Sequence, residues 1–109
     1  MAKKIVVKKK LQKGRYYLHR DNSKVGFHPS YIYYKNDNKN QYKLVCFTTS
    51  SGSHRTRLNK NINPNSSSPC YVLNSPRIAK RKSISYELKG YKVTDLRDKY
   101  IIMRIKKKK

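Results

Sequence analysis

The stretch that most constrains this chain is residues 28–50, where two segments of strand composition flank a polar turn. Residues 31–34 and 42–47 are dominated by β-branched and aromatic side chains, which β-strands favour. Residues 35–40 between them are rich in Asn and Asp, whose side chains bond the local backbone and stabilise turns. The pattern predicts a β-hairpin whose second strand ends in the hydroxyl side chains of residues 48–50.

Shorter segments of strand composition recur along the chain, at residues 13–18, 55–58, 70–73 and 83–86. Residues 19–27 are polar and predict a connection, and residues 59–69, rich in Asn, Ser and Pro, predict a long loop. Several short strands with turn-rich connections indicate a mainly β fold, a small and strongly curved sheet or barrel.

One helix is predicted, close to the C-terminal end of the sequence. Thr94 is a natural N-cap, and Asp95 with Asp98 place negative charge in the first turn, where the helix dipole favours it. Residues Leu96, Tyr100 and Met103 recur at helical spacing. This spacing predicts that they face the core.

A chain of 109 residues is long enough for one domain with a modest core. Basic residues cluster at both ends of the sequence. We therefore expect a basic N-terminal arm over residues 1–12, a single domain over 13–105 and a basic tail over 106–109.

The charge balance is the strongest indicator of partners. The chain has 28 Lys and Arg against five Asp and Glu, a formal net charge of +23. Such self-repulsion costs stability and is usual in proteins that bind polyanions, because each phosphate contact releases condensed counterions. Nucleic acid is the first candidate partner, an acidic protein the second and an anionic membrane surface the third. A basic surface that serves only solubility is the alternative.

Other classes of protein are less well supported by the sequence. No segment approaches the roughly 18 consecutive apolar residues of a membrane span, and the basic N-terminus lacks the apolar run of a signal peptide. We therefore expect a cytoplasmic protein with no membrane partner. Cys46 and Cys70 are isolated, without His at metal-ligand spacing. They are interpreted as small buried hydrophobic residues, and neither a metal nor a cofactor is expected.

Five segments, in chain order, carry a family pattern: Lys13-Gly14-Arg15-Tyr16-Tyr17-Leu18, Gly26-Phe27-His28-Pro29, Tyr31-Ile32-Tyr33-Tyr34-Lys35-Asn36-Asp37, Phe47-Thr48-Thr49-Ser50, and Tyr71-Val72-Leu73 with Pro76-Arg77-Ile78. They resemble the MazF/PemK toxins, small SH3-like barrels that act as sequence-selective ribonucleases in toxin–antitoxin systems. Arg15 stands where the family usually has an acid, and His28 where it has its catalytic Arg. The chain is also similar to small phage and mobile-element proteins with an Asn-Pro-Asn loop, here residues 63–65.

The resemblance implies a metal-independent endoribonuclease that cleaves single-stranded RNA, with an acidic antitoxin as partner and a homodimer as the usual family assembly. Such cleavage requires a base, an acid and fixed positive charge. His28 would be the base or acid, because imidazole exchanges protons near neutrality. Thr49 would hydrogen-bond a phosphate oxygen. Arg55 or His54, together with Arg77, would supply charge or the second proton-transfer group.

Further residues are candidates for binding nucleic acid without taking part in chemistry. Tyr31 and Tyr33 alternate on one strand face and would stack unpaired bases, although packing in the core is the competing interpretation. The cationic candidates for phosphate contacts are His54, Arg57, Lys80, Arg81 and Lys82.

Two other functions remain open at this point. One is a non-catalytic RNA- or DNA-binding protein with an SH3-like barrel, in which His28 only begins a strand and Thr49 only satisfies a turn. The other is an interaction protein of a mobile element that binds an acidic host or antitoxin protein. A cluster of His28 with Thr49 distinguishes the nuclease from both.

Overall fold

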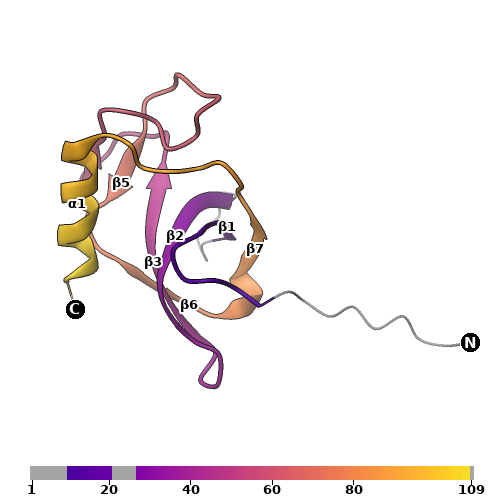
Figure 1. Cartoon of the computed structure of the whole chain (residues 1–109). Coiled ribbons are helices and arrows are strands. Elements are labelled where there is room, and N and C mark those ends of the chain that lie inside the picture. Colours follow the sequence, from indigo (N-terminus) through magenta and orange to yellow (C-terminus); the bar gives the residue numbers. More distant parts are fainter. Residues whose placement is uncertain (1–9, 21–26, 109) are drawn as a thin grey trace, which may run out of the picture.

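A computed structural model describes residues 10–20 and 27–108, and it is mainly antiparallel β-structure with one C-terminal helix (Figure 1). The strands are β1 (Tyr16–Arg20), β2 (Phe27–Asn36), β3 (Gln41–Thr48), β4 (Arg55–Arg57), β5 (Tyr71–Leu73), β6 (Arg77–Ala79) and β7 (Ile84–Glu87). A 3₁₀ turn, η1 (Arg81–Ser83), precedes β7, and helix α1 spans Leu96–Lys106. Most of the basic N-terminal arm expected from the sequence lies outside the described residues.

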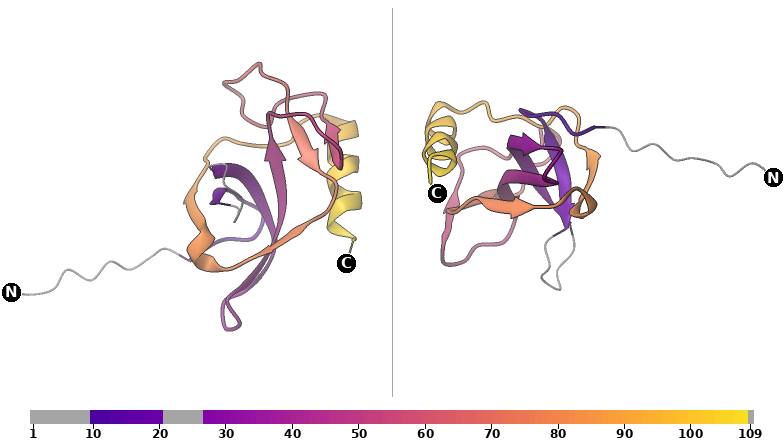
Figure 2. Two further views of the ribbon diagram at one scale, coloured as in Figure 1. Left: turned by 180° about the vertical axis from the view of Figure 1, so that it is seen from behind. Right: turned by 90° about the horizontal axis from the view of Figure 1, so that it is seen from below.

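The predicted hairpin is confirmed as β2 and β3, and it is the centre of the sheet. The strand order is β4-β5-β3-β2-β1-β7, and β6 also pairs with β3. Strand β3 changes partners along its length: Tyr42–Leu44 pair with β6, while Phe47 and Thr48 pair with β5. The β2–β3 register shifts between Ile32 and Tyr34, and such a bulge increases local bending and twist. Figures 1 and 2 show β2 curving strongly beside β3.

Both faces of the central strands are buried, which explains the uninterrupted apolar run in β3. Val45 and Phe47 belong to one core cluster, which includes Ile102 and Ile105 of α1. The second cluster lies against the alternate residues and contains Leu11, Tyr17, Ile32, Tyr42, Leu44, Cys46, Ala79 and Ile84. Because side chains alternate along a strand, the two clusters occupy opposite faces of the hairpin. We call them the helix-side core and the far-side core.

The start of helix α1 differs from the prediction by one residue. Asp95, not Thr94, is the N-cap, and its carboxylate accepts a hydrogen bond from the Asp98 backbone N–H at 3.0 Å. This bond lowers the pKa of Asp95 below its usual value, because it favours the charged carboxylate.

The prediction of which face of the helix is buried was wrong. Leu96, Tyr100 and Met103 are 77%, 63% and 43% exposed, whereas Ile102 and Ile105 are buried. Asp98 fixes this orientation: its buried carboxylate accepts the backbone N–H groups of Asn59 at 2.8 Å and Lys60 at 3.1 Å. The loop therefore holds the Asp98 face of α1 inward.

Two further predictions are confirmed: residues 59–69 form neither helix nor strand, and Cys46 and Cys70 are free and buried. Burial raises the pKa of the Cys70 thiol. In the part of the chain that the structure describes, no helix has the length and apolar character needed to cross a membrane.

Candidate functional site

Polar side chains from β1, β2 and β3 share one face at one end of the sheet. His19 lies directly opposite His28 in the β1–β2 register, and Ser30 lies directly opposite Cys46 in the β2–β3 register. Directly opposed residues of an antiparallel pair project to the same face, with Cβ atoms roughly 4.5–5.5 Å apart. His28 and Ser30 are two residues apart on β2, so the whole group lies on the far-side face.

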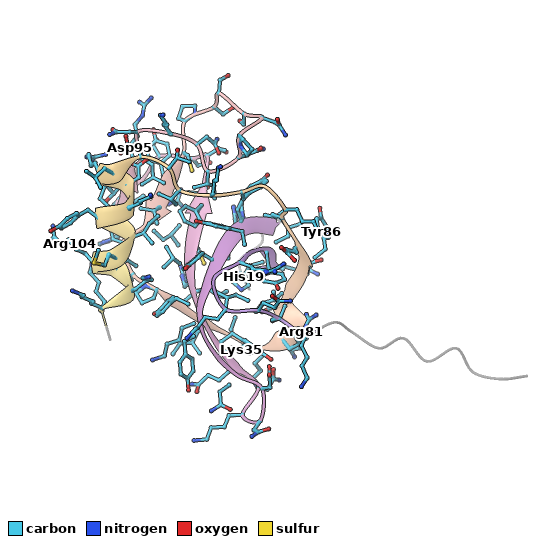
Figure 3. All side chains as sticks on the ribbon, in the orientation of Figure 1. His19, Lys35, Arg81, Tyr86, Asp95 and Arg104 are labelled. Atoms are coloured by element: carbon cyan, nitrogen blue, oxygen red, sulfur yellow. The ribbon has the colours of Figure 1, made fainter. Side chains whose placement is uncertain are left out.

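His19 is held in place by this group. The imidazole is only 6% exposed, and its Nδ1 lies 3.9 Å from Cys46 Sγ. Ser30 Oγ donates a hydrogen bond to the same sulfur at 3.5 Å. Figure 3 shows His19 inside the molecule, within the curve of the strands. The His28 side chain, by contrast, is half-buried. One imidazole is therefore fixed, and the residue opposite it is closer to solvent.

Arg77 belongs to the same face. It lies opposite Leu44 in the β3–β6 register, and Leu44 belongs to the far-side core. A depression of about 310 Å³ is lined by His19, Arg20, Arg77, Ile78, Ala79, Lys80, Lys82 and Ser83. This lining contains an imidazole and four cations but no carboxylate. It is therefore suited to bind an anion.

A second depression of about 390 Å³ shares Arg77 and is lined also by Ser53, His54, Arg55, Leu73, Ser75 and Pro76. Arg55 is positioned by the chain after β3, because its Nη1 donates to the carbonyl oxygens of Ser50 at 2.9 Å and Ser51 at 3.4 Å. His54 has a φ of 63°, in the left-handed region that few residues other than Gly adopt. The second depression thus brings His54, Arg55 and Arg77 together.

Thr49 lies in the exposed bend directly after β3. The buried hydroxyl at this strand end belongs instead to Thr48, whose Oγ1 accepts a hydrogen bond from the Ser50 backbone N–H at 3.2 Å. His28 and Thr49 lie at the same end of the β2–β3 pair. Among hydrogen bonds that join described residues, none involves the His28 ring or the Thr49 hydroxyl.

The cationic binding candidates are only partly gathered at this site. Lys80 and Lys82 line the first depression and His54 the second. Arg57 lines a separate polar depression of about 380 Å³ beside the 59–69 loop. Arg81 stabilises the turn before β7, because its Nη1 donates to the Ile84 carbonyl oxygen at 2.6 Å (Figure 3).

Tyr31 and Tyr33 lie on the opposite face from the histidines and pack against the helix-side core. The Tyr31 and Tyr16 rings have centroids 5.0 Å apart, and Lys106 Nζ lies 5.6 Å from the Tyr31 centroid. The Tyr33 hydroxyl is buried without a hydrogen-bond partner among the described residues, and burial raises its pKa. In this structure the two rings therefore contact the protein core.

His19 and Arg20 were missed as candidate site residues, because residues 19–27 were interpreted as a polar connection. Strand β1 in fact continues to Arg20. The available signal was the alternation of Tyr17 with His19, which extends the strand by one inward-facing position.

The described residues contain no group of three or more side chains that could hold a metal ion. Comparison of the sequence with protein-family models and with curated proteins finds no match.

Proposed function

We propose that this protein is a metal-independent endoribonuclease that cleaves single-stranded RNA, built on an SH3-like barrel like that of the MazF/PemK toxins. The observation that carries the proposal is that His28 lies directly opposite His19, and that His19 lines the carboxylate-free depression around Arg77. Two imidazoles and fixed positive charge are the groups that this chemistry requires.

In the proposed reaction one imidazole removes the proton from a ribose 2′-hydroxyl, and the 2′-oxygen attacks the adjacent phosphorus. The bond from phosphorus to the 5′-oxygen breaks, and the other imidazole protonates that leaving oxygen. The products are a 2′,3′-cyclic phosphate and a free 5′-hydroxyl. Arg77 and Arg55 stabilise the charge on the phosphorane, and the exposed Thr49 hydroxyl donates to a phosphate oxygen.

The cations around the site would hold the RNA on either side of the cleaved bond. Arg20, Lys80 and Lys82 extend the positive surface from Arg77. The net charge of +23 supports both RNA binding and, by the family resemblance, neutralisation by an acidic antitoxin. A homodimer and a cytoplasmic location belong to the same proposal.

A non-catalytic nucleic-acid-binding protein is the second candidate. It is favoured by the small exposure of His19, because a buried imidazole is poorly placed to exchange protons with RNA. The depression itself, lined by four cations, would bind phosphates without any proton transfer. In that case the resemblance to the toxins is one of fold alone.

The discriminating experiment incubates the purified protein with a long single-stranded RNA in the presence of EDTA. Wild type is compared with His28→Ala, Thr49→Val and Lys39→Ala, the last being an exposed cation in the β2–β3 turn at the far end of the hairpin. The nuclease proposal expects discrete fragments from wild type and Lys39→Ala, and intact RNA with the other two variants. Full cleavage by His28→Ala would overturn the nuclease proposal. Retarded but intact RNA with wild type would establish the binding protein.

A further inference from the structure

Helix α1 carries an apolar stripe that no other described element covers. Leu96, Tyr100 and Met103 follow one another at intervals of four and three residues, so they lie along one line of the helix surface. They are 77%, 63% and 43% exposed. The residues buried against the protein, Ile102 and Ile105, lie on the other side of the helix. Figures 1 and 2 show α1 packed on one side of the sheet with its outer surface open.

Cations flank the stripe along both sides. At 100° per residue, Arg97 and Arg104 lie on one side of it and Lys99 and Lys106 on the other. Figure 3 shows Arg104 directed away from the sheet. The one carboxylate within the helix, Asp98, is turned inward and bound to the backbone of the 59–69 loop. The outer half of α1 is therefore apolar and basic.

The stripe borders a groove. A depression of about 500 Å³ lies beside the helix, and Tyr100 belongs both to the stripe and to the lining of this depression. Its apolar lining comes from Tyr100, Ile101 and Ile105, and its cations are Arg97, Arg104 and Lys108. Lys108 is anchored, because its Nζ donates to the Asn74 carbonyl oxygen at 2.8 Å. The groove thus combines a concave apolar floor with cations along its edges.

We propose that this surface, the outer stripe of α1 with its groove, binds an acidic amphipathic helix of a partner protein. Leucine-like side chains of the partner would cover Tyr100 and fill the groove, while its carboxylates would pair with Arg104. Charge favours this occupant over a second copy of the chain at this surface, because two copies docked here would bring the cations that flank their stripes against one another. The concave shape favours a rod-like partner over a flat membrane surface.

This proposal rests on the acidic partner of the proposed function and assigns that partner a surface. It can be tested apart from RNA cleavage, because α1 packs on the helix-side core and the histidines lie on the opposite face. The probe is a fluorescent synthetic peptide of about three heptads, with Leu at the a and d positions and Glu elsewhere. A peptide of the same composition in scrambled order is the control probe. Binding is measured by fluorescence anisotropy with wild type, Tyr100→Ala and Tyr86→Ala. Tyr86 is the matched control, because it lies on β7 and is 65% exposed.

The expected result is binding of the patterned peptide that Tyr100→Ala weakens about tenfold and Tyr86→Ala does not change. Equal binding of the patterned and scrambled peptides, or no loss in Tyr100→Ala, would show attraction by charge alone and overturn the proposal. It would also be overturned by self-association in sedimentation that Tyr100→Ala abolishes, or by binding to anionic vesicles that displaces the peptide. RNA cleavage is expected to be unchanged in Tyr100→Ala, which separates this test from that of the nuclease.

Discussion

At the scale of single residues, the folded chain depends on a few polar groups that connect distant segments. Asp98 is the clearest example, with 1% exposure and both carboxylate oxygens bonded to backbone N–H groups of the 59–69 loop. Arg97 Nη1 lies 3.6 Å from the same carboxylate. A single carboxylate therefore decides which face of α1 is buried.

Asp98→Ala is expected to lower the free energy of unfolding by about 2 kcal/mol, because it leaves two backbone N–H groups without their charged acceptor. Urea denaturation measures this loss. Lys99→Ala, on the exposed side of the same helix, is the control and should stay within about 0.5 kcal/mol of wild type. Similar stability of Asp98→Ala and Lys99→Ala would refute the role assigned to the carboxylate.

The lowered pKa of Asp95 predicts an acid-sensitive helix start. The folded state holds this carboxylate ionised to lower pH than the unfolded chain does. Its contribution to stability is thus complete above the ordinary carboxyl pKa and is lost as the pH falls through the lowered value. In Asp95→Asn, which keeps a capping oxygen without a titrating group, Tm should fall less over this acid range. Thermal melts of wild type and Asp95→Asn across this acid pH range measure the difference. Parallel curves of Tm against pH for the two proteins would contradict the prediction.

At the scale of elements, local patterns predicted the hairpin well and the helix orientation badly. Residues 28–50 carry alternation and an Asn-rich turn, both of which depend only on neighbouring residues. Helix α1 has aliphatic side chains on two faces, and the contact of Asp98 with a loop distant in sequence selects between them. Strand β1 was predicted over residues 13–18 but spans Tyr16–Arg20. Its end was placed two residues too early, because His19 and Arg20 are polar but continue its register with β2.

The turn that leads into β1 gives a test at this scale. Gly14 has a φ of 90°, and its N–H donates to the Ile32 carbonyl oxygen at 2.7 Å. Gly14→Ala is expected to cost about 1 kcal/mol or more, because L-residues are strained at this φ although the space around it is open. Gly52→Ala, where an added Cβ meets only the Arg55 side chain at 3.6 Å, is the matched control. Equal midpoints in urea for the two variants would contradict this.

At the scale of the whole molecule, the candidate site depends on pairings that no local pattern contains. His28 and Arg77 were candidates from the sequence, and they share a face only because β6 pairs with β3. The two depressions around Arg77 are lined by five Lys and Arg side chains and no carboxylate. Five cations are therefore gathered where the proposed substrate would bind.

Five phosphate contacts would give a slope of log Kd against log salt of about 3.5 for single-stranded RNA, at about 0.7 per contact. Arg77→Ala should reduce this slope by about 0.7, while Lys39→Ala should leave it unchanged. Filter binding of an RNA with 2′-deoxy substitutions, which the proposed reaction cannot cleave, measures both. Equal slopes for wild type and Arg77→Ala would place the RNA elsewhere on the surface.

The opposed histidines are proposed to transfer the protons of RNA cleavage. The most direct test of this role is mass spectrometry of the fragment ends made from one RNA in EDTA by wild type and by His28→Ala. The expected result is 2′,3′-cyclic phosphate and 5′-hydroxyl ends from wild type and their loss in His28→Ala. Fragments with 3′-hydroxyl and 5′-phosphate ends, or the same cyclic phosphate ends in the same amount from His28→Ala, would contradict it.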